Sequence, residues 1–238
     1  MFDYTDTDLQ AIEKYMSSDR MAGYYNYARG DKWIAVRLYE RNTRISEALY
    51  GVIQALEITL RNAMHRVLTR HLGSATWYET IPLQDSERES VEEAKQTVQG
   101  DCPGLVPALI PGKVVAELSF AFWVRLLSFN YEETLWKPYL VRIFPLKLHE
   151  QRNAVYVRLK DLKTLRNRIA HHERITCGKR DPERDYASIV ETIGWISPTI
   201  KNWVESTTCF HDRIKEGIPK RPKTPESTMA AAVPIPEN

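Results

Sequence analysis

The residues that could carry chemistry gather in one short segment, LRNRIAHHER, which runs from Leu165 to Arg174. Within six positions it places Arg166, Asn167 and His171. Arg offers a permanently charged fork of donors that matches phosphate oxygens. His takes or gives a proton near neutral pH, and Asn orients either group or a ribose hydroxyl. These groups can cut RNA without a metal: one deprotonates the 2′-hydroxyl, another protonates the leaving oxygen, and a cation stabilises the phosphate.

The surroundings of this segment favour an anionic partner. From Arg142 to Arg174, nine Lys or Arg residues stand against three acidic residues, a local charge of +6. Such a patch attracts phosphate backbones through counterion release, without distinguishing RNA from DNA. The whole chain of 238 residues has a net charge of only +2. The prediction of nucleic-acid binding therefore depends on the local patch alone.

The segment lies at the end of a helix predicted from about Leu148 to about Ala170. Arg166 and His171 are five residues apart, or about 140° around an ideal helix, whereas Asn167 and His171 share a face. Either the helix unwinds near Ala170, or two copies of the chain face one cleft. The second arrangement is favoured because a dimer supplies two His residues for the acid and base roles.

Helical spacing dominates the rest of the chain and predicts an all-α fold. The clearest helix follows Asn42 or Thr43 as N-cap and stops at Gly73. One apolar stripe marks it: Ile45, Leu49, Val52, Leu56, Leu60, Ala63 and Val67. Further helices are expected at Asp8–Ser17, Asp31–Arg41, Asp85–Val98, Lys113–Ser128 and Asp185–Ser197, with a restart at Pro198. Residues 1–215 are interpreted as one helical domain and residues 216–238 as a disordered Pro-rich tail.

Three segments in order resemble a known family. Arg-Asn-x-x-x-His resembles the Arg-x4-6-His motif of the HEPN superfamily, and the wider context resembles its Abi-like, or abortive-infection, branch. The supporting stretches are EITLRN at Glu57–Asn62, AELSFAFW at Ala116–Trp123 and the segment Leu165–Ile175. The resemblance is taken to extend over roughly Leu9 to Trp203, most of the chain.

The resemblance implies a HEPN-like helical bundle with additional N-terminal and C-terminal helices. It also implies a homodimer and an endoribonuclease toxin that arrests the host during phage infection. Arg166 and His171 would be catalytic and Asn167 would support them. RNA is the expected substrate, and a neutralising antitoxin or regulatory partner is a candidate partner.

Five further residues are candidates for substrate binding or support: Glu57, Arg61, His172, Arg168 and Arg174. Glu57 and Arg61 either form an intrahelical ion pair or line the same cleft as Arg166. His172 stands beside the motif and substitutes for His171, assists it or merely packs. These alternatives stay open at the level of sequence.

Other classes of function are disfavoured. His171, His172 and Cys177 lack a second ligand pair at zinc spacing, so neither a metal nor another cofactor is expected. Met1–Gln10 has no apolar run, and Val114–Leu127 is too short and too charged to span a bilayer. We therefore expect a cytoplasmic protein without membrane anchorage. The three cysteines form no disulfide framework.

Two rival interpretations remain. In the first, the chain is a non-catalytic module that binds RNA or a partner protein. In the second, it is a structural scaffold whose basic helix end only complements the helix dipole and forms ion pairs. The acidic segment from Glu79 to Asp101 is interpreted as a solvated face, with restraint of the basic cleft as the alternative.

Overall fold

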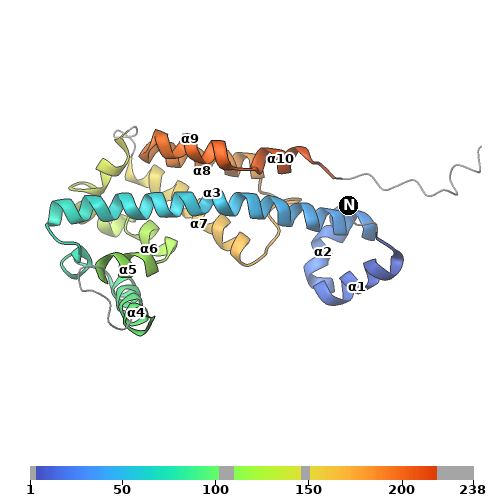
Figure 1. Ribbon diagram of the computed structural model, residues 1–238, viewed down its shortest axis with the longest axis horizontal. Helices are drawn as coiled ribbons and strands as arrows, with labels where there is room; N and C mark the ends of the chain where they lie inside the picture. The colour runs from blue at the N-terminus through green and yellow to red at the C-terminus, as the bar shows by residue number, and fades with distance from the viewer. Residues whose placement is uncertain (1–3, 102–109, 146–150, 219–238) are drawn as a thin grey trace, which may run out of the picture.

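A computed structural model describes residues 4–101, 110–145 and 151–218. Within these residues the regular elements are helices and none is a strand, which confirms the all-α fold class. Figure 1 shows α3 as the long axis of the molecule, with α1 and α2 at one end, α4 and α5 at the other, and α8, α9 and α10 along one side. The HEPN-like identity of the bundle stays a prediction. The α-helices are α1 (Asp6–Met16), α2 (Ser18–Tyr27), α3 (Lys32–Leu72), α4 (Asp85–Asp101), α5 (Ile110–Glu117), α6 (Phe120–Arg125), α7 (Arg152–Ala170), α8 (Pro182–Ile196), α9 (Pro198–Thr207) and α10 (Phe210–Lys215).

The two helices expected on either side of Asn42 are one helix, so the predicted boundary there is wrong. The N-cap of α3 is Asp31, whose carboxylate accepts the Ile34 N–H at 3.0 Å. Asn42 is buried inside the helix, where its amide binds a distant loop instead of capping. The predicted stop is confirmed, because Gly73 takes the left-handed conformation with φ 71°.

The helix expected from Lys113 to Ser128 is broken into α5 and α6. The break lies at Ser119, whose hydroxyl accepts the Phe122 N–H and caps α6. The indole of Trp123 donates to the carbonyl of Leu118 at 3.2 Å, so one carbonyl freed by the break is satisfied. A hydrophobic stripe continues through both helices, which is why the sequence pattern alone suggested one.

Apolar residues form two separate clusters along α3. The main cluster contains the predicted stripe from Ile45 to Ala63 together with the buried face of α7: Val155, Leu159, Leu162, Leu165 and Ile169. A smaller cluster lies where α1 and α2 meet the first turns of α3: Leu9, Met21, Tyr24, Ala28, Trp33, Ala35, Val36 and Leu38. The end of α7 is therefore held between the main core and the N-terminal helices.

The helices expected at Asp8–Ser17, Asp85–Val98 and Asp185–Ser197 are found as α1, α4 and α8, whereas α10 was not predicted. α7 begins at Arg152, and the start expected near Leu148 lies outside the described residues. The tract around Tyr24 is helical, α4 follows the acidic segment, and α9 restarts at Pro198 with Ser197 as its N-cap. Between α6 and α7 the chain forms short 3₁₀ and π turns: Phe129–Tyr131, Glu132–Trp136 and Leu140–Ile143. The proposed disordered tail lies outside the described residues from 219 onward. In the part of the chain that the structure describes, we find no helix with the length and apolarity to cross a membrane.

Candidate functional site

The end of α7 is closed by a Schellman turn centred on His172. The Glu173 N–H donates to the Arg168 carbonyl at 2.8 Å, and the His172 N–H donates to the Ile169 carbonyl at 3.0 Å. These are the two backbone bonds that define the motif. His172 has φ 56°, the left-handed position that Gly or Asn normally occupies. The backbone of His172 therefore has a structural role, because it closes the helix end. This role does not depend on what the imidazole ring contacts.

The three residues predicted to be catalytic lie at the surface on this helix end. Asn167 and His171 are exposed, and Arg166 is half-buried with 34% of its side chain accessible. Solvent therefore reaches the imidazole and the carboxamide, and it reaches part of the guanidinium group. A substrate phosphate could approach each of them without unfolding of the helix.

Arg166 has a carboxylate partner on the neighbouring helix. Its Nε lies 3.7 Å from Oε2 of Glu57 on α3. This separation is an ion-pair distance but too long for a hydrogen bond, and the Nε has no hydrogen-bond partner among the described residues. Of the two interpretations of Glu57, this geometry favours the one in which it orients Arg166. The half-buried carboxylate holds the guanidinium without consuming its donors.

Arg61 and His65, which also lie on α3, contact other parts of the protein than the end of α7. Arg61 Nη1 donates to the Ala116 carbonyl of α5 at 3.3 Å, so it links two helices. His65 Nδ1 accepts the indole N–H of the buried Trp77 at 2.9 Å. Burial, followed by the charge of Arg61, lowers the pKa of His65. Neither residue is brought to the end of α7, and no ion pair joins Arg61 to Glu57 among the described residues.

Arg168 and Arg174 bind the chain itself. Arg168 Nη2 donates to the Arg174 carbonyl at 3.0 Å, and its Nε lies 3.2 Å from a Glu173 carboxylate oxygen. Arg174 donates to the Gly23 carbonyl of α2 and stacks its guanidinium over the Tyr24 ring, 5.8 Å from the centroid. These contacts account for both residues as supports of the loop after α7, so their place in substrate binding stays a prediction.

Asn42 organises the same loop from the side of α3. Its Oδ1 accepts the backbone N–H groups of Ile175 and Thr176 at 2.8 and 3.0 Å and the Thr176 hydroxyl at 3.1 Å. Arg20 of α2 adds a bond of 2.7 Å to the His172 carbonyl. The loop that follows His171 is thus fixed from two helices. The sequence analysis missed this role, because Asn42 was interpreted as a helix cap.

The helix geometry bears on how Arg166 and His171 can meet. α7 is regular through Ala170, and the left-handed turn comes only at His172. The Cα of His171 is therefore placed by helical residues and keeps its angular separation of about 140° from Arg166. Unwinding begins too late to bring the two residues onto one face. A single copy of the chain presents them on different sides of the helix end.

The net charge of +6 counted from Arg142 to Arg174 overstates the positive charge around α7 in the folded protein. Arg152 is buried and paired with Glu132 at 2.9 Å, and Arg158 is paired with Glu191 at 2.5 Å. Glu132 and Glu191 lie outside the counted range from Arg142 to Arg174, yet each pairs with a cation of α7. The cations of α7 that keep no carboxylate partner among the described residues lie near its second half, at Lys160 and Lys163.

A groove of about 470 Å³ opens beside the end of α7, between this helix and α3. Its walls include Thr43, Ser46, Glu47 and Tyr50 from α3 and His172 from the Schellman turn. A larger groove of about 870 Å³ separates α7 from α8. There Arg180 donates to both Asp161 and Asp185, so the cation is already matched by carboxylates. The smaller groove is the one that adjoins the motif.

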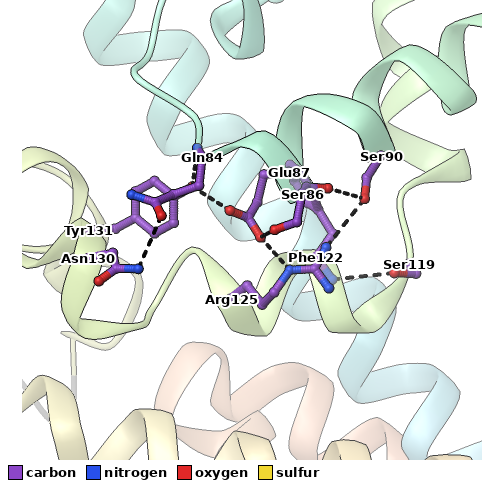
Figure 2. Close-up of polar contacts among 9 residues, drawn as sticks. All are labelled: Gln84, Ser86, Glu87, Ser90, Ser119, Phe122, Arg125, Asn130 and Tyr131. Atoms are coloured by element: carbon purple, nitrogen blue, oxygen red, sulfur yellow. Dashed lines mark hydrogen bonds and ion pairs between the residues drawn. The ribbon is translucent and has the colours of Figure 1, made fainter.

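A buried polar network distant from the motif was also missed by the sequence analysis. Glu87 of α4 is 3% exposed and accepts hydrogen bonds from Tyr131, Ser86 and Arg125. Figure 2 shows these side chains converging between α4, α6 and the turn around Tyr131. Burial raises the pKa of Glu87, but the hydrogen bonds and the charge of Arg125 outweigh it and leave the pKa lowered. The network joins α4 to α6 and to the turn around Tyr131.

Comparison with protein-family models, with curated proteins and with solved structures finds no match to this chain. The features that bear on function are those of the helix end itself. Its decisive features are a partly accessible Arg beside a carboxylate, an accessible His at the helix end, and a following loop that α2 and α3 hold by hydrogen bonds.

Proposed function

We propose that the chain is a metal-independent endoribonuclease whose active centre is the end of α7. Arg166 binds the scissile phosphate, and His171 acts as general base or acid. Asn167 holds the substrate or the imidazole. The observation that carries the proposal is that Arg166 and His171 both reach solvent at one helix end, while Glu57 lies 3.7 Å from the Arg166 Nε. The chemistry available there is proton transfer beside a fixed cation.

The reaction needs two proton transfers. A neutral imidazole removes the proton of the 2′-hydroxyl, and the oxygen attacks the adjacent phosphorus. The bond from phosphorus to the 5′-oxygen breaks as a protonated imidazole gives that oxygen its proton. The products are a 2′,3′-cyclic phosphate and a free 5′-hydroxyl. Arg166 stabilises the extra negative charge on the phosphate as the bond changes occur.

A second copy of the chain completes this centre. Two imidazoles are needed at once, and within one copy Arg166 and His171 point to different sides of the helix.

The test uses purified protein, total RNA and a chelator. We expect the wild type to cut, His171→Ala and Arg166→Ala to lose at least about 100-fold in rate, and His71→Ala, an exposed histidine at the far end of α3, to cut normally. Salt-sensitive RNA binding without any cleavage would favour the non-catalytic module instead. Absence of both would leave the scaffold interpretation.

The second copy has its own test. Mixing wild-type and His171→Ala proteins, under conditions that let subunits exchange, should inactivate the mixed dimers, because each would hold only one His171 imidazole. Activity that stays in proportion to the wild-type share, with mixed dimers shown to form, would contradict the shared centre.

The proposed use in abortive infection has a separate test. Expression of the wild type should arrest growth, and expression of His171→Ala should not.

A further inference from the structure

We infer that the groove between α3 and the end of α7 binds the nucleobase next to the scissile phosphate, and that Glu47 selects guanine there. The inference deepens the proposed function and rests on its RNA-binding part. The groove volume of about 470 Å³ falls within the range of roughly 300–1,000 Å³ typical of small-ligand sites. It therefore has room for a base and part of its sugar.

The groove adjoins the proposed centre directly. His172, which follows the proposed catalytic His171 in the chain, forms part of its wall together with Ile169 and Ala170 of α7. A phosphodiester held at this helix end would place a flanking nucleotide at the mouth of the groove. Single-stranded RNA is recognised in this way, by bases splayed out of the stack and contacted on their edges.

Tyr50 supplies a surface for stacking. Its ring keeps 47% of its surface exposed on α3 and lines the groove. A tyrosine that is left open at the edge of a groove offers a flat face on which a base can stack. Stacking gives affinity to every base, so it explains binding but not selection.

Glu47 supplies the selection. It lines the groove, is exposed, and has no hydrogen bond or ion pair among the described residues. An unmatched carboxylate beside a phosphate site repels RNA unless it receives hydrogen bonds from the base. Guanine offers two adjacent donors, N1–H and the 2-amino group, that match the two carboxylate oxygens. Uracil offers one donor between two carbonyl oxygens that the carboxylate repels.

Ser46 adds a group that guanine can use. Its hydroxyl oxygen is buried and lacks a hydrogen-bond partner among the described residues, although the residue lines the groove. Buried hydroxyls are normally satisfied, by protein or by water. A guanine O6, next to N1–H on the same edge, is an acceptor for this hydroxyl. By contrast, the hydroxyl of Thr43 already donates to the Tyr39 carbonyl at 3.2 Å.

The test measures binding of two fluorescent hexaribonucleotides in chelator, identical except for one central guanine or uracil among adenines. A His171→Ala background keeps the probes intact. We expect about tenfold tighter binding of the guanine probe, and loss of this preference in Glu47→Gln. Tyr50→Ala should weaken both probes about tenfold, and Tyr50→Phe should bind like the parent. Glu89→Gln on α4 and Tyr15→Ala on α1, both exposed and remote, are the matched controls.

The outcomes separate this inference from the nuclease proposal. Equal binding of the two probes by the parent protein overturns the inference, even if the wild type cuts RNA. A guanine preference that Glu47→Gln abolishes, in a wild type that cuts nothing, supports the inference and rejects the nuclease. If Glu47→Gln instead changes the oligomeric state in size-exclusion chromatography, Glu47 contacts a second copy and the inference is wrong.

Discussion

Glu57 of α3 and Arg166 of α7 face one another with 3.7 Å between the carboxylate Oε2 and the guanidinium Nε. The pair links the long central helix to the helix that carries the motif, at residues 109 positions apart in the chain. Both side chains are partly exposed, at 23% for Glu57 and 34% for Arg166. A pair of this kind contributes at most about 1 kcal/mol to folding, so its importance lies in orientation.

Replacing this carboxylate should therefore reduce activity more than stability. We expect Glu57→Gln to lower the rate of RNA cleavage between about 10- and 100-fold, because a misplaced phosphate-binding group loses catalysis steeply. The unfolding midpoint should change little. Rates and thermal unfolding measured together check this, with the exposed Glu117→Gln of α5 as control. An unchanged rate would mean that Glu57 does not position Arg166.

The left-handed backbone conformation of His172 predicts that replacing this residue can make the fold more stable. Replacing it by Gly removes the strain of a non-glycine residue with φ 56°, so we expect His172→Gly to stabilise the fold by about 1 kcal/mol. Thermal unfolding of the two proteins measures the gain. Cleavage that stays at the wild-type rate would show that the ring only packs, and a loss of rate in the stabilised protein would show that it assists His171.

Asn42 should be far less tolerant of change. In Asn42→Ala the N–H groups of Ile175 and Thr176 lose their acceptor inside the protein. We expect destabilisation of about 2–4 kcal/mol, because each unsatisfied buried donor costs about 1–3 kcal/mol. Denaturant unfolding checks this, and hydrogen exchange at Ile175 and Thr176 should accelerate. Asn62→Ala, exposed on the same helix, should stay within about 0.5 kcal/mol of the wild type. A small effect at Asn42 would show that the loop is held by other contacts.

The Glu87 network predicts a dependence of stability on pH. Its folded-state pKa is lowered below the ordinary value of 4.5, so the ionised carboxylate stabilises the fold above that ordinary value. This contribution is lost as the pH falls through the folded-state pKa. We expect Glu87→Gln to destabilise the protein by about 2–3 kcal/mol at pH 7, and the difference from the wild type to shrink toward pH 3. Unfolding free energies across this range, with Glu89→Gln as control, provide the measurement. A difference that is constant with pH would contradict the lowered pKa.

The helices were predicted correctly where the spacing of buried apolar residues determines the sequence pattern. The stripe from Ile45 to Ala63 is buried in the structure, and α7 ends at Ala170 as expected. The failures arose where a polar residue had two uses. Asn42 has the side chain of a helix cap but binds a loop 131 or more residues away, and Ser119 interrupts a continuous apolar stripe by capping α6. Long-range partners of polar side chains cannot be read from local spacing.

The candidate site shows the same division. The residue types at Arg166, Asn167 and His171 were visible in sequence, and the structure places all three where solvent reaches them. The groove residues Glu47 and Tyr50 gave no signal, because exposed polar and aromatic residues on a helix are common. The left-handed turn at His172 gave no signal either, because neither Gly nor Asn stands at that position. The charge count failed for a third reason: Glu132 and Glu191 neutralise Arg152 and Arg158 only after folding.

The most direct measurement identifies the ends of RNA products formed in chelator. Mass spectrometry of a single synthetic RNA, incubated with wild-type protein, should reveal a 2′,3′-cyclic phosphate on one fragment and a 5′-hydroxyl on the other. His171→Ala should yield neither, while remaining folded by circular dichroism. Fragments with the same ends formed at full rate by His171→Ala, or an intact RNA with the wild-type dimer, would contradict the assignment of the end of α7 as a nuclease centre.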